Sequence, residues 1–205
     1  MGKRILLSLL GLMLISVVHA QQPDTLSRGI VLKTNLLYDA TSTINLGVEI
    51  GLADQWTLDI SGNYNPWEFA DNRKMKHWLI QPEARYWLDR KFDKHFFGFH
   101  LHGGQYNWGG MLPWGFKNGK MFGAVKNRNI LENRYQGWLV GAGFSYGYHW
   151  KWSERWSTEF SLGLGYAYLN YDKYPCASCG EKLKEGSRHY FGPTKAAVSM
   201  IFILK

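Results

Sequence analysis

The sequence predicts an all-β protein, an eight-stranded antiparallel transmembrane β-barrel built as an up-and-down meander with long outer loops. Three observations predict it. The chain starts with the features of a secretory signal peptide. It then divides into segments of about ten residues in which apolar and polar side chains alternate. Its Trp and Tyr residues fall near the ends of those segments, on the apolar face, where membrane–water interfaces would lie.

Residues 1–20 have the pattern of a cleavable signal peptide. Two positive charges in Met1–Arg4 precede an apolar run over Ile5–Val18, and small side chains follow at the expected cleavage site. The run is shorter than the ~20 residues that a membrane helix needs. No Cys follows the site, so nothing indicates a lipoprotein anchor. We expect residues 21–28 to form a short periplasmic segment and residues 29–205 to form the barrel.

The alternation that follows has period two, the repeat of a β-strand. Between residues 44 and 52 the apolar side chains on one face are Ile44, Leu46, Val48, Ile50 and Leu52. Residues 56–64 repeat the pattern, and six further strands are expected at about 30–38, 77–88, 95–106, 135–150, 156–169 and 191–204. No later run approaches about 18 consecutive apolar residues, which excludes a bundle of membrane helices.

Charged side chains fall on the face opposite the apolar one. They are Lys33, Glu49, Asp59, Glu83, Arg85, Glu159 and Lys195. A lipocalin-type barrel would show the reverse, an apolar interior and a polar exterior. Because an eight-stranded barrel is just wide enough for side chains to fill it, we expect a paired lumen network centred on Glu83 and Arg85. A gated pore and an acid–base pair are the functional alternatives.

The aromatic residues and the links support the same arrangement. One rim is expected to carry Tyr38, Tyr64, Trp78, Trp138, Tyr166 and Tyr168, and the other Trp56, Tyr86, Phe97, Tyr148, Trp150 and Trp156. Short links near 53–55, 89–94 and 151–155 alternate with long ones at 65–76, 107–134 and 170–190. Since short turns of such barrels face the periplasm, both termini are expected there.

Several motifs together resemble a known family. They are Lys33-Thr34-Asn35-Leu36-Leu37-Tyr38-Asp39, Asn45-Leu46-Gly47-Val48-Glu49, Tyr64-Asn65-Pro66-Trp67, Trp78-Leu79-Ile80-Gln81-Pro82-Glu83-Ala84-Arg85-Tyr86-Trp87 and Gly103-Gly104-Gln105-Tyr106-Asn107. This set is similar to an uncharacterised family of small outer-membrane barrels of Bacteroides-type bacteria, a domain of unknown function. The resemblance covers nearly all of the mature chain. It implies an eight-stranded barrel and a surface role near fimbria-like genes, and no reaction.

Cys176 and Cys179 form a C-x-x-C motif in the last long loop. Behind a signal peptide, thiols tend to be oxidised, which favours a small disulfide. A metal site with His189 as a further ligand and a free or catalytic pair are the alternatives.

The 107–134 loop is basic and aromatic. Its candidate surface-binding residues are Trp114, Phe116, Lys117, Lys120, Lys126 and Arg128. This composition is also seen in nucleic-acid binding. At a bacterial surface the abundant anions are lipopolysaccharide phosphates, so we expect contact with that layer and no nucleic acid. The alternative is a merely solvated loop.

No catalytic, cofactor or metal site is expected. His77, His100, His102 and His149 lie beside no matching Ser in strand register. The function expected is therefore that of a monomeric structural, adhesive or accessory surface protein of the outer membrane, in contact with its lipid and with a surface protein partner. A narrow channel or transport accessory is the second hypothesis, and a rim-located lipid-modifying enzyme is the third.

Overall fold

The computed structural model describes residues 29–69, 73–110, 133–175 and 180–204. These contain β1 (Ile30–Asn35), α2 (Leu36–Asp39), β2 (Ile44–Gly51), β3 (Trp56–Asn65), β4 (Glu68–Phe69), β5 (Arg73–Trp87), β6 (Lys94–Gly109), β7 (Asn133–Lys151), β8 (Trp156–Pro175) and β9 (Lys184–Leu204). The expected signal peptide and the segment at 21–28 lie outside the described residues. So do Cys176, Cys179 and the candidate loop residues Trp114, Phe116, Lys117, Lys120, Lys126 and Arg128.

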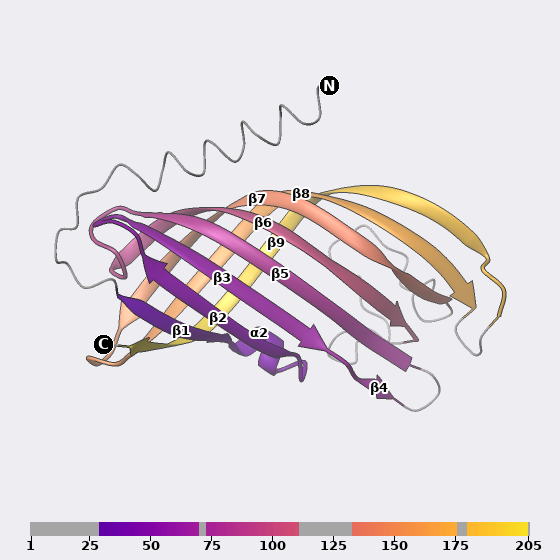
Figure 1. Cartoon of the computed structure of the whole chain (residues 1–205), viewed down its shortest axis with the longest axis horizontal. Coiled ribbons are helices and arrows are strands. Elements are labelled where there is room, and N and C mark those ends of the chain that lie inside the picture. Colours follow the sequence, from indigo (N-terminus) through magenta and orange to yellow (C-terminus); the bar gives the residue numbers. More distant parts are fainter. Residues whose placement is uncertain (1–28, 70–72, 111–132, 176–179, 205) are drawn as a thin grey trace, which may run out of the picture.

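The strands form one antiparallel sheet that closes on itself (Figure 1). Each long strand pairs with its neighbours along the chain, and the ring closes where β1 pairs with β9. The two-residue β4 pairs only with β5 and extends the sheet beside the end of β3. The expected all-β antiparallel meander is therefore confirmed: among the described residues, eight strands close into a ring and β4 adds a short ninth strand at its edge. Among the described residues, no helix is long and apolar enough to span a membrane.

The strands are strongly staggered. Val31 of β1 lies opposite Ile203 of β9 on one side and Glu49 of β2 on the other. If one steps from Val31 to the paired residue on each following strand in turn, the path around the ring returns to β9 at Gly192. Gly192 is eleven residues from Ile203, the residue of β9 that pairs with Val31 directly. One residue of this offset belongs to the bulge between β8 and β9. Such a stagger requires the strands to tilt against the axis of the ring, as Figure 1 shows.

The two ends of the ring differ. At the turn end, tight links join β2 to β3, β5 to β6 and β7 to β8, and the C-terminal end of β9 lies there as well (Figure 1). Leu52 N–H, for example, donates to Trp56 O at 2.8 Å. At the opposite, loop end, the wall is uneven, because β1 and β2 have six and eight residues whereas β8 and β9 have 20 and 21.

The loop-end boundaries differ from those expected. β8 continues to Pro175, and β9 already begins at Lys184. Both faces of this hairpin are polar, and the strands extend because their backbone pairing does not need an apolar face. β1 ends at Asn35 and not near residue 38. The Asn35 side chain accepts a hydrogen bond from Leu37 N at 3.1 Å and caps α2. The expectation for Tyr38 was therefore wrong: the turn of α2 brings this residue to the lumen cavity described below and away from the outer face.

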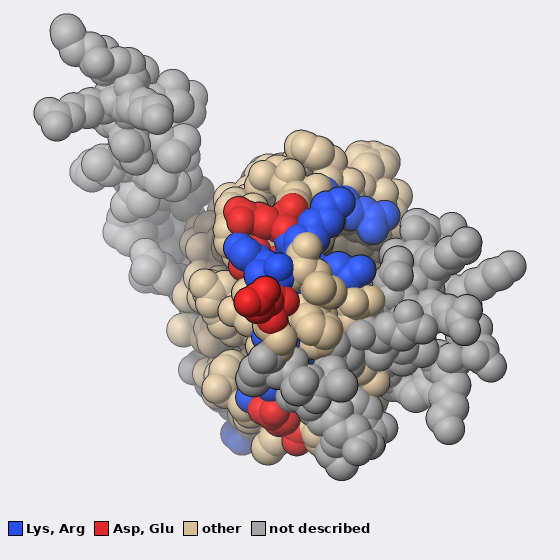
Figure 2. All heavy atoms as spheres, turned by 90° about the vertical axis from the view of Figure 1, so that its right-hand side faces the viewer, with Lys and Arg blue, Asp and Glu red and all other residues tan. Residues whose placement is uncertain are grey.

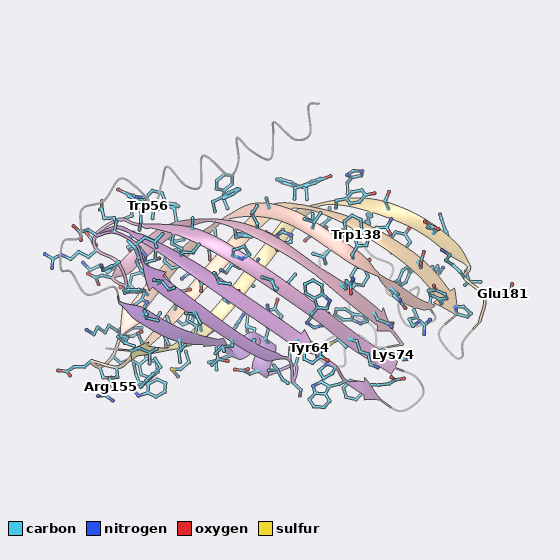
Figure 3. All side chains as sticks on the ribbon, in the orientation of Figure 1. Trp56, Tyr64, Lys74, Trp138, Arg155 and Glu181 are labelled. Atoms are coloured by element: carbon cyan, nitrogen blue, oxygen red, sulfur yellow. The ribbon has the colours of Figure 1, made fainter. Side chains whose placement is uncertain are left out.

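The ring is inside out compared with a soluble β-protein. Large apolar side chains lie exposed on its outer face, and the residues that alternate with them are buried inside and are mostly polar (Figure 3). The labelled Trp56 and Trp138 point outward near opposite ends. The other expected rim aromatics are exposed as well, apart from Tyr38 and the half-buried Tyr168. Strand periodicity alone was sufficient to assign these faces.

Candidate functional site

An ion cluster fills the turn-end half of the lumen, and its origin is a row of acids. Glu49, Asp59 and Glu83 stand directly opposite one another on β2, β3 and β5. Like charges in that position repel. Arg85, two residues along β5 on the same face, compensates for them: its Nη1 donates to Glu49 Oε2 at 2.8 Å, and its Nη2 donates to Asp59 Oδ2 at 2.7 Å and to Glu83 Oε2 at 2.9 Å.

Three further charges, from β1, β8 and β9, complete the cluster. Glu159 of β8 accepts from Arg85 Nη1 and from Lys33 Nζ, each at 2.9 Å. Lys33 also pairs with Glu49, and Lys195 pairs with Glu83. The structure thus brings together all seven charges expected in the lumen, four carboxylates with three cations, and their side chains are almost fully buried. Sequence parity placed them on one face, and the closure of the ring made them neighbours.

Hydroxyl groups donate to the carboxylate oxygens of Glu49 and Glu83 that Arg85 does not contact. Thr57 donates to Glu49, and Ser145 donates to Glu83. Thr57 in turn accepts from the indole of Trp87 at 2.9 Å. Because buried charges are tolerated only when paired and hydrogen-bonded, this arrangement is typical of a structural network. Within the seven charged side chains of the cluster, Asp59 Oδ1 is a buried oxygen that has no hydrogen-bond partner among the described residues.

Below the cluster, apolar side chains close the turn end of the lumen. Trp87, Phe96, Ile201 and Val31 are fully buried there, and the rings of Trp87 and Phe96 lie 4.9 Å apart. The guanidinium carbon of Arg85 stands 4.4 Å from the centre of the Phe96 ring. We call these four residues the apolar plug. These residues were not among those expected in the lumen, although Trp87 has the same strand parity as Arg85, and Phe96 the same parity as His100.

Above the cluster, the loop-end half of the lumen holds a cavity of about 880 Å³. Its lower wall includes Lys33, Asp59, Arg85 and Lys195 of the ion cluster. The apolar and aromatic residues of its upper wall are Leu37, Tyr38, Met75, Leu79, Tyr106, Tyr135, Leu139, Leu169 and Tyr171, and polar residues such as Asn45, His77 and Arg188 stand among them. This volume falls within the ~300–1,000 Å³ typical of small-ligand pockets. No motif in the sequence signalled it, since it arises where the lumen side chains of separate strands meet.

The rim of the loop end is charged (Figure 2). Lys182 pairs with Asp172 at 3.1 Å and with Glu185 at 2.9 Å, and these bonds raise the pKa of Lys182. Hydrogen bonds from Lys76 and Lys74 lower the pKa of Glu68 to about 2. Such exposed pairs stabilise little, and what they indicate is a rim that faces water.

The lumen histidines lie apart from the hydrogen bonds of the ion cluster, and each has its own neighbours. His100 Nε2 lies 2.9 Å from Thr194 Oγ1, and the rings of His100 and His102 lie 5.7 Å apart. His149 packs edge-on against Trp87 in the plug. In the part of the chain that the structure describes, no three His, Cys, Asp or Glu side chains are placed to hold a metal ion. The metal alternative for Cys176 and Cys179 falls outside that part.

Comparison with known families gives one match. The model of a protein family of unknown function, DUF3575, matches residues 7–204. The chain belongs to this family. The expectation of an uncharacterised family is thereby confirmed. No curated protein and no solved structure matched the chain. Membership of DUF3575 supplies no reaction, so any function has to be argued from the ring, the cluster and the cavity.

Proposed function

We propose that this DUF3575 protein is a monomeric outer-membrane β-barrel, exported through the signal peptide at residues 1–20. We further propose that it acts as a structural, adhesive or accessory surface protein, linked to fimbria-like assembly as the family resemblance implies, and not as an enzyme. The observation that carries the membrane proposal is the inverted ring. Phe144 and Leu162 are 71% and 60% exposed on the outer face, whereas the charges are buried inside.

The inverted distribution has a simple energetic reason. Apolar surface costs roughly 25 cal/mol per Å² when it faces water. The outer face of the ring would meet that cost over most of its area in a soluble protein, and hydrocarbon removes it. Aromatic side chains near both ends of the strands and a charged loop end fit the two membrane–water interfaces.

Purification from the outer-membrane fraction, with a mobility shift between boiled and unboiled gel samples, is the result expected of this proposal. A folded barrel resists detergent and migrates differently from its unfolded chain. The matched measurement is fractionation of the same cells for a known soluble periplasmic protein. Recovery of the folded chain with that soluble marker would overturn the proposal.

The plug and the cluster argue against the channel hypothesis. Trp87, Phe96, Ile201 and Val31 fill the turn end, and the paired charges fill the lumen beside them. Reconstituted in a planar bilayer, the wild-type protein is expected to show no steady conductance. The double variant Trp87→Ala and Phe96→Ala should pass more current if it folds, and Trp138→Ala on the outer face is the control. Steady open-channel currents from the wild type would instead favour a pore.

The basic loop is proposed as the part that contacts the cell surface. Its candidate residues Trp114, Phe116, Lys117, Lys120, Lys126 and Arg128 lie outside the described residues, and their basic and aromatic composition supports the proposal. Contacts led by charge weaken with salt, since screening shortens to ~8 Å at physiological ionic strength. Replacing the four bases by Gln should abolish the salt-dependent part of binding to lipopolysaccharide. Unchanged binding at low salt would show that these bases do not bind lipopolysaccharide and that the loop is merely solvated.

A further inference from the structure

The lumen changes character along its length. Its turn-end half is ionic and closed, whereas its loop-end half holds a cavity of about 880 Å³ in whose wall apolar and aromatic side chains stand beside polar ones such as Asn45, Gln105 and Arg188. Barrel interiors that meet water are polar. Leu139 and Leu169 stand directly opposite each other on β7 and β8, and the ring of Tyr171 lies 5.7 Å from that of Tyr135. This upper wall is therefore suited to an apolar occupant.

The strand pairing of the ring wall is interrupted beside this cavity. β9 pairs with β1 only as far as Ser199, opposite Asn35, although β9 continues on β8 to Lys184. The turn of α2 stands in place of further β1 residues. The Asn35 side chain covers the first unpaired positions of β9, because it donates to Ala196 O at 3.1 Å and accepts from Val198 N at 3.2 Å. α2 packs against β9 here, and we call their junction beyond Val198, where the β1–β9 pairing has ended, the seam.

The seam lies between the cavity and the outer face. Leu37 and Tyr38 of α2 line the cavity from one side of the seam, and Pro193, Thr194 and Ala196 of β9 line it from the other. The outer face around the seam is apolar, with Leu36, Ile44, Leu162, Leu164 and Phe191 exposed, the last at 82%. A strand edge at membrane depth must be covered, because hydrocarbon offers no hydrogen bonds.

We propose that one hydrocarbon chain of a membrane lipid passes through the seam and lies in the cavity above the ion cluster. This inference rests on the proposed membrane location. The apolar upper wall contacts the chain, and the ion cluster limits its depth, since a methylene chain gains nothing beside Lys33, Asp59 and Arg85. The headgroup stays at the charged rim of the loop end, outside the ring.

A photocrosslinking experiment tests the proposal on the full chain. A benzophenone amino acid replaces one aromatic residue at a time: Tyr171 in the cavity, Phe144 on the outer face, or Trp87 in the plug. The protein is reconstituted in vesicles of phosphatidylethanolamine and phosphatidylglycerol, with or without lipid A. Crosslinked lipid is expected at Tyr171 and Phe144 and not at Trp87. The mass of the adduct tells whether the chain comes from phospholipid or from lipid A.

The outcomes separate the two proposals. Lipid at Phe144 but not at Tyr171 means that the ring is embedded and that no chain enters, which overturns this inference alone. Absence of lipid at all three positions overturns the membrane location itself. Lipid at Trp87 as well would show that the label reports any lumen position, and it would overturn the chain's confinement above the cluster.

A second measurement uses variants that fill the cavity. Leu139→Trp adds bulk inside, whereas Val140→Trp adds the same bulk one residue along, on the outer face. Displacing about two methylenes of a bound chain should lower the lipid retained in native mass spectrometry about tenfold for Leu139→Trp. Val140→Trp should retain as much lipid as wild type. Equal retention by both variants would overturn the proposal.

Discussion

Replacing Arg85 by Met is expected to destabilise the protein by about 3–5 kcal/mol, because removing one partner of a buried ion pair leaves the others uncompensated. Arg85 alone contacts all four carboxylates of the cluster, and its side chain is 1% exposed. Without it, two ammonium groups remain for four buried acids. The free energy of unfolding, from urea titration of the protein in lipid vesicles followed by tryptophan fluorescence, measures the loss.

Two further variants make the Arg85 result specific. Lys94→Met removes a cation whose 3.4 Å pair with Asp89 is half exposed, and it should cost no more than ~1 kcal/mol. Adding Glu159→Gln to Arg85→Met removes one of the stranded acids and should recover part of the stability, so that the two effects are not additive. Equal costs for Arg85→Met and Lys94→Met would show that the cluster does not hold the lumen together.

The change in the free energy of unfolding caused by introducing Arg on the outer face tests the membrane location. Leu162 lies midway along the part of β8 flanked by exposed Trp156 and Tyr166, and Leu183 lies beyond the ring at the loop end. The two leucines are 60% and 57% exposed. In a membrane, Leu162→Arg should cost about 2–4 kcal/mol and Leu183→Arg about 0–1 kcal/mol, since the cost depends on depth.

A water-soluble ring predicts a different outcome for this pair. Both leucines would then face water, and both arginines would change the free energy of unfolding by similar, small amounts. The same urea titration distinguishes the cases, with Ser161→Asn on the lumen side of β8 as a third variant that adds no charge. Costs for Leu162→Arg and Leu183→Arg within ~0.5 kcal/mol of each other would contradict a membrane position for the middle of β8.

The sequence alone determined the all-β class of the fold and the face taken by most residues within the strands. Strand side chains alternate with period two, so local patterns were enough to send Glu49, Asp59 and Arg85 inward and Leu46 and Leu162 outward. The aromatic rims followed from the same parity. The exception was Tyr38, because the cap at Asn35 turned the chain into α2, and one short turn overrides the alternation.

Tertiary structure decided what those residues do together. The stagger of the ring sets which inward residues are neighbours, and it is a property of all the strands at once. It brings Lys33 to Glu159, 126 residues apart in the chain, and puts the plug below Arg85 and the cavity above it. β9 likewise extends beyond the end of β1 because its polar segment pairs through the backbone with β8. Side-chain patterns in the sequence do not predict such pairing. The seam and the cavity therefore exist only in the closed ring.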